Sequence, residues 1–88
     1  MIIEIDKSFK KDFLKLKNKV IKDRIINKIE NIENLESIKN ISNIKIMKWF
    51  NNFYRIRIWD YRIWFRYENN KITLLRVRSR KDIYNIFP

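Results

Sequence analysis

Apolar residues recur along this chain with a helical period before residue 35 and a strand-like period after residue 43. Steps of three and four residues predict amphipathic helices over residues 8–16 and 18–34. The first helix carries its apolar stripe at Phe9, Phe13 and Leu16. The second carries a stripe of isoleucines at Ile21, Ile25, Ile29 and Ile32. Two such helices in succession indicate a helical hairpin with one buried face.

Strand-like segments lie at both ends of these helices. Residues 2–5 form a short strand at or near a sheet edge, and Asp6 or Ser8 is placed to cap the helix that follows. Further strands are expected over residues 44–49, 53–58, 61–67 and 72–78. Their short connections favour an antiparallel meander.

The predicted fold class is therefore α+β, in a single small domain over residues 1–88. Its order is an N-terminal strand, a two-helix hairpin, an antiparallel meander of about four strands, and a short C-terminal helix or tail.

The sequence contains no glycine. Turn positions that need a positive φ must therefore fall to asparagine or aspartate, which stand at Asn51–Asn52, Asp60 and Asn69–Asn70. Walker loops, dinucleotide-binding fingerprints and nucleophile elbows are excluded, because each needs backbone without a Cβ near the ligand.

Cysteine and histidine are also absent. Disulfides and the usual transition-metal ligand sets are thereby excluded, so we expect neither a metal nor a cofactor. The N-terminus has an apolar run of only three residues before Glu4, too short for a signal peptide or a membrane span. A reducing, cytoplasmic setting fits.

Positive charge is concentrated in the second half of the chain. The formal net charge is +11, and residues 43–88 alone carry eleven basic and three acidic groups, a net charge of +8. Arginine offers a rigid fork of donors that fits phosphate oxygens. Seven of the eight arginines stand at Arg55, Arg57, Arg62, Arg66, Arg76, Arg78 and Arg80. RNA or DNA is the favoured partner, and a membrane is not, because the arginines alternate with apolar residues in a strand-like period.

A two-residue turn at Trp59–Asp60 sets Arg57 opposite Arg62 and Arg55 opposite Trp64. One face of this hairpin is then apolar and the other cationic. Like charges across a ladder repel, so the pairing costs stability unless an anion binds or the side chains turn into water. Such a conflict marks a candidate functional site.

The last strand has two possible registers. With a three-residue loop after Glu68, Leu75 and Val77 point into the core. Arg76 and Arg78 then join the cationic face, whereas a two-residue loop would bury both arginines. We expect the three-residue loop.

Two motifs follow one another in the second half, YRIRIWDYRI over residues 54–63 and RKDIY over residues 80–84. They resemble the RelE/ParE toxin superfamily, and the order of strand, two helices and meander looks like its RelE branch over the whole chain. The resemblance implies a type II toxin that is a ribosome-dependent endoribonuclease, cleaving mRNA in the A site of the 30S subunit without a metal. It also implies a cognate antitoxin as partner, with a toxin–antitoxin heterotetramer as one arrangement.

The implied reaction is attack of the ribose 2′-hydroxyl on the adjacent 3′ phosphate. The resemblance assigns the active site to Arg55, Arg57, Arg62, Arg80 and Tyr84. Arg62 and Arg80 would stabilise the negative charge of the transition state. Arg55 and Arg57 would orient the hydroxyl or the phosphate, because a guanidinium stays protonated. Tyr84 would stack on a base, assist proton transfer, or simply pack against the sheet.

Further RNA contacts are expected at Lys45, Lys48, Trp64, Arg66, Arg76, Arg78 and Lys81. A merely solvated strand edge is an equal alternative for Lys45 and Lys48.

The chain departs from the family pattern at two positions near these motifs. Ser79 stands where the branch often carries histidine, which leaves the general acid and base open. Trp59 replaces the usual turn glycine, as a stacking platform or as a hydrophobic plug in a dimer. Two other functions therefore stay open: a ParE-like toxin that inhibits gyrase, and a catalytically inactive nucleic-acid-binding domain of the same fold.

Overall fold

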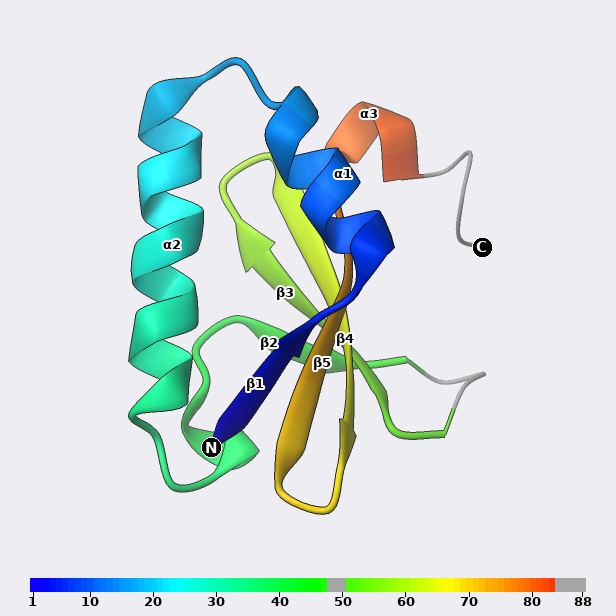
Figure 1. The fold of residues 1–88 in the computed structure, drawn as a ribbon. Coiled ribbons are helices and arrows are strands. Elements are labelled where there is room, and N and C mark those ends of the chain that lie inside the picture. Colours follow the sequence, from blue (N-terminus) through cyan, green and yellow to red (C-terminus); the bar gives the residue numbers. More distant parts are fainter. Residues whose placement is uncertain (48–50, 84–88) are drawn as a thin grey trace.

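The computed structural model describes residues 1–47 and 51–83, and the fold below refers to these. One sheet runs in the strand order β1-β5-β4-β3-β2. Its strands are β1 (Ile2–Ile5), β2 (Ile44–Ile46), β3 (Phe53–Ile58), β4 (Tyr61–Glu68) and β5 (Lys71–Ser79). The helices are α1 (Lys7–Lys15), α2 (Lys19–Glu33) and α3 (Arg80–Ile83), with a 3-10 turn at Ile38–Asn40. The α+β prediction is confirmed (Figure 1).

The strands β2 to β5 form the predicted antiparallel meander. β1 joins the meander at its edge and pairs in parallel with the first half of β5, from Ile2 opposite Lys71 to Ile5 opposite Leu74. The predicted strand over residues 44–49 is shorter in the structure, where β2 ends at Ile46 and residues 48–50 lie outside the described part.

The helices begin where their capping residues predict. The Asp6 carboxylate accepts from the Ser8 backbone N–H at 3.1 Å, so Asp6 rather than Ser8 caps α1. The Asn18 side chain accepts from the Val20 and Ile21 N–H groups and caps α2. Each cap therefore satisfies part of the backbone donors that the first helical turn leaves unpaired.

The core lies between the helices and one face of the sheet. Ile21, Ile25 and Ile32 of the predicted stripe are buried, and Ile29 packs partly buried beside them. From α1, Phe9 is buried as well. The sheet contributes Ile56, Ile63, Phe65, Ile72, Leu74 and Val77. The opposite face, which carries most of the arginines, is left for the candidate site.

The loop between β4 and β5 has two residues, Asn69–Asn70, so the expected three-residue loop is wrong. The first part of β5 accordingly buries Leu74 opposite Phe65. A register shift between Trp64 and Phe65 then inserts one extra residue, Leu75, into β5.

Because of this bulge, Arg76 and Arg78 lie on the face expected for them, although the loop is shorter than predicted. Beyond it, Val77 is buried opposite Ile63, and Arg78 stands opposite Arg62 on the cationic face. The expectation that Leu75 lies in the core is wrong, because Leu75 is only half-buried and Leu74 takes that place.

Asparagine takes the positive-φ turn positions at Asn43, Asn52, Asn69 and Asn70, with φ between 52° and 65°. The exception is the β3–β4 turn, where Trp59 has φ 52° and Asp60 was expected to supply the left-handed residue. In this turn the prediction is wrong, and a bulky side chain carries the strained conformation.

No helix within the described residues is long and apolar enough to cross a membrane.

Replacing Asn70 by alanine tests the left-handed β4–β5 turn. At φ 59° a plain Cβ is unfavourable, so Asn70→Ala should lower the free energy of unfolding by about 1 kcal/mol. Asn70→Gly at the same position should keep or raise it, and urea denaturation measures both. Equal stability of the alanine and glycine variants would contradict the turn conformation.

Candidate functional site

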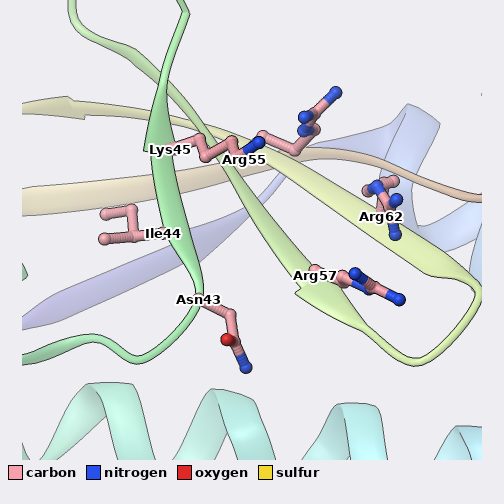
Figure 2. A pocket seen from close by; sticks show the side chains of 6 residues that line it. All are labelled: Asn43, Ile44, Lys45, Arg55, Arg57 and Arg62. Atoms are coloured by element: carbon pink, nitrogen blue, oxygen red, sulfur yellow. The ribbon is translucent and has the colours of Figure 1, made fainter.

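Four cationic side chains from three neighbouring strands surround one pocket of about 190 Å³. Lys45 comes from β2, Arg55 and Arg57 from β3, and Arg62 from β4. Figure 2 shows Lys45 and Arg55 extending beside each other, and Arg57 and Arg62 nearer the β3–β4 turn. Among the described residues no aspartate or glutamate lines this pocket. We call it the cationic pocket, and it is suited to an anion.

The predicted pairing of Arg57 with Arg62 is confirmed. Both side chains turn toward the same backbone oxygen. The carbonyl of Trp59 accepts from Arg57 Nε at 3.2 Å and from Arg62 Nη1 at 3.3 Å. This shared neutral acceptor holds the two like-charged side chains together, and a phosphate beside them would add charge-assisted hydrogen bonds.

Trp59 is anchored by its ring as well as by its carbonyl. The guanidinium carbon of Arg24, on α2, lies 3.8 Å from the centre of the indole ring, a cation–π contact. The ring is 49% exposed. Trp59 lies at the surface and against α2, and this contact holds the left-handed turn beside Arg57 and Arg62. Its expected roles, a stacking platform or a hydrophobic plug in a dimer, stay predictions.

The two arginines at the end of β5 are held by a carboxylate on α1. Asp12 is buried and accepts from Arg76 at 2.7 and 3.0 Å and from the Val77 backbone N–H at 3.1 Å. Arg78 Nε stands 3.0 Å from the same carboxylate as an ion pair. The hydrogen bond that Arg76 donates to Asp12 raises the pKa of Arg76. These arginines therefore close the edge of the sheet around Asp12 and do not line the cationic pocket.

Other predicted residues fall at different distances from the pocket. Trp64 shares the arginine face but is 2% exposed, so it offers little surface for the RNA contact expected there. Arg66 lies toward the far end of β4, where it lines a separate pocket with Glu68 and Lys71. The expectation that Arg66 extends this binding surface is not supported by that placement.

The C-terminal motif begins beside the β3–β4 turn. The Arg80 backbone N–H donates to the Asp60 carbonyl at 2.6 Å, which brings the start of α3 to the end of the sheet where Arg57 and Arg62 lie. Arg80 and Lys81 are exposed. Tyr84 and Lys48 lie outside the described residues.

Sequence reasoning missed Asp12, Arg24 and Asn43, which support or line this region. A signal for Asp12 was present, because position 12 falls on the helical stripe of Phe9 and Leu16. An acidic residue on an apolar stripe needs a buried partner, and the arginines of β5 supply it. No such signal exists for Asn43, which is one asparagine among many.

No group of three potential metal ligands occurs among residues 1–47 and 51–83.

Comparisons with known proteins give consistent findings. The sequence model of the ParE toxin of the type II toxin–antitoxin system parDE matches residues 3–84. The toxin RelE3 of Methanocaldococcus jannaschii is 43% identical over 44 residues, and the chain spans about half the length of this curated relative.

Solved structures extend the likeness over the whole chain. A chain of the RelB–RelE antitoxin–toxin complex from Methanococcus jannaschii aligns with a TM-score of 0.85 and 35% identity, covering 97% of this chain and 99% of that chain. A chain of the E. coli RelBE toxin–antitoxin complex aligns with a TM-score of 0.70 and 15% identity, covering 89% and 94%. The second likeness concerns the fold alone.

Replacing Asp12 by asparagine tests how the β5 arginines are held. Asp12→Asn leaves Arg76 and Arg78 without their buried counter-charge, so the free energy of unfolding should fall by about 3 kcal/mol. Chemical denaturation measures the change, and Asp23→Asn on the exposed face of α2 is the matched control. If both variants unfold like the wild type, the carboxylate is not the anchor described above.

Proposed function

The chain belongs to the RelE/ParE toxin superfamily of type II toxin–antitoxin systems, in its RelE-like branch, and from this premise we propose that it is a ribosome-dependent endoribonuclease. Its substrate is mRNA in the A site of the 30S subunit. One observation carries the proposal: Arg57 and Arg62 face each other over a pocket that Lys45 and Arg55 also line. Four cations around one cavity are suited to a single phosphodiester.

The chemistry follows from what arginine can do. The ribose 2′-oxygen loses its proton and forms a bond to phosphorus, while the bond to the 5′-oxygen breaks and that oxygen takes up a proton. The products are a 2′,3′-cyclic phosphate and a 5′-hydroxyl end. Between them the phosphorus is pentavalent and its equatorial oxygens carry additional negative charge, which fixed guanidinium groups stabilise better than they stabilise the ground state.

The pocket divides these tasks by position. Arg62 and Arg57 are held by the Trp59 carbonyl, so their guanidinium groups are preorganised beside the pocket for phosphate oxygens. Arg55 and Lys45 lie opposite each other on β3 and β2, farther from the β3–β4 turn than Arg57. They would hold the substrate backbone. Arginine stays protonated near neutral pH, so these groups orient and stabilise rather than accept protons. Arg80 and Tyr84 belong to the same proposal through the family motif alone.

A cognate antitoxin is the proposed protein partner. The solved relatives are toxin–antitoxin complexes. The whole chain has a formal charge of +11, which favours a partner that covers its surface with acidic side chains. A toxin–antitoxin heterotetramer is one arrangement of this complex.

Programmed ribosomes test the nuclease. Wild-type protein should generate new 3′ ends within A-site codons, and Arg62→Ala should slow this cleavage by about a hundredfold or more, because one transition-state donor is lost. Tyr84→Ala tests the motif residue in the same assay. Lys10→Ala, an exposed lysine on α1, serves as control and should cleave at the wild-type rate. Absence of new 3′ ends with the wild-type protein would refute the proposal.

A second candidate function rests on the matched family description, which is that of the ParE toxin. In that case the arginine face would bind and inhibit DNA gyrase without cleaving RNA. A gyrase supercoiling assay separates the two functions: the nuclease proposal expects no inhibition at concentrations that cleave mRNA on ribosomes. Inhibition of supercoiling together with intact mRNA would favour the second candidate.

A further inference from the structure

A second hollow, of about 490 Å³, lies beside the cationic pocket, between α2 and the end of β3. Its lining residues are Arg24, Asn27, Lys28, Asn31, Ser42, Asn43, Arg57, Ile58 and Trp59. Asn43 and Arg57 line both cavities, and Figure 2 shows Asn43 extending from the segment before β2 toward the α2 side. The two cavities therefore adjoin each other at Asn43 and Arg57, and we call the second one the groove.

One face of α2 is built for this groove. Arg24, Asn27, Lys28 and Asn31 are spaced by three and four residues, so they form a single polar stripe beside the buried isoleucines. The acidic residues of α2 are Asp23, Glu30 and Glu33, and none of them lines the groove. The stripe thus presents cations and amides without a carboxylate among the described residues.

The two cations of this stripe are held by neutral groups, and no carboxylate within residues 1–47 and 51–83 pairs with them. Arg24 lies over the Trp59 ring at 3.8 Å, and Lys28 Nζ donates to the Ser42 carbonyl over a long 3.4 Å. Burial lowers the pKa of Lys28, so the charged ammonium is less favourable in the folded chain than in water. A bound anion would remove this disadvantage.

We propose that the groove between α2 and the β3–β4 turn binds the RNA segment that flanks the scissile phosphate, with Lys28 and Arg24 on its backbone and the asparagines on a base. This inference rests on the proposed function, since it places the neighbouring nucleotide of the same strand. A polynucleotide with one phosphate at Arg57 and Arg62 must continue into an adjacent space, and this groove adjoins the pocket at Arg57.

An acidic protein segment is the rival ligand, and the amides argue against it. Asn27, Asn31 and Asn43 each offer a donor and an acceptor. Base edges carry both kinds of group and can use both, whereas carboxylates only accept. The half-exposed Trp59 ring at the rim adds a surface on which a base can stack.

Binding of a fluorescein-labelled single-stranded RNA of about twelve nucleotides to the protein alone, followed by anisotropy, tests the groove. Lys28→Gln should weaken binding about threefold to tenfold and flatten the slope of log affinity against log salt by about 0.7, because one phosphate contact is lost. Arg24→Gln should act in the same direction. Lys10→Gln removes the same charge from the exposed face of α1 and should leave the slope unchanged.

Folding does not confound the comparison of Lys28→Gln with Lys10→Gln. Because the pKa of Lys28 is lowered in the folded chain, its charge opposes folding below that pKa, and the neutral glutamine should be at least as stable. If Lys28→Gln and Arg24→Gln both match Lys10→Gln in RNA affinity and salt slope, the groove does not bind RNA and the inference is overturned.

Two further outcomes separate this inference from its rival and from the proposed function. If Lys28→Gln weakens binding of a polyglutamate peptide but not of RNA, the groove belongs to an acidic protein segment and the inference is again overturned. Ribosomal cleavage by the wild-type protein would still support the nuclease in either case. Conversely, loss of RNA binding in Lys28→Gln without any wild-type cleavage would support the groove and refute the nuclease.

Discussion

The site depends on an electrostatic constraint, a row of three arginines on adjacent strands. Arg57 faces Arg62, and Arg62 faces Arg78, with Cβ atoms about 5 Å apart as in any antiparallel ladder. Two oxygen groups make the row tolerable. The Trp59 carbonyl accepts from the first two arginines, and the Asp12 carboxylate pairs with the third. The charged acceptor, Asp12, lies at the β5 end of the row, whereas the cationic pocket lies toward the β3 end.

Helix α1 covers the part of the β5 edge that β1 leaves unpaired. β1 pairs only with the first half of β5, and beyond it the backbone edge of β5 would face solvent. Asp12 lies on α1 at this level and accepts from the Val77 N–H, so a side chain continues where the ladder stops. The same carboxylate draws Arg76 and Arg78 around the edge. The contacts of Asp12 therefore both cover the edge of the sheet and order one end of the arginine row.

Periodicity was sufficient to predict the helices, the antiparallel meander and the Arg57–Arg62 pairing, because each depends on contacts that are local in sequence. The features that failed depend on contacts between distant segments. The bulge at Leu75 follows from the pairing of β5 with β4 and its packing against the core. No turn residue in the sequence indicates this bulge. A positive φ at Trp59 is tolerated because Arg24, thirty-five positions earlier, holds the ring. Trp64 alternates with arginines and so was read as exposed, although it is buried.

The division of charge along the chain is also misleading once the chain is folded. The excess of arginine in the second half locates the sheet face, and this part of the prediction needed no structure. The first half is less basic on balance, yet its helix α2 turns Arg24 and Lys28 toward the groove and keeps Asp23 and Glu30 out of it. A net charge counted over a segment averages the faces of a helix, whereas a ligand meets only one of them. The charge that a bound anion experiences is therefore set by the packing of α2 on the sheet, which brings two cations of the first half beside four of the second.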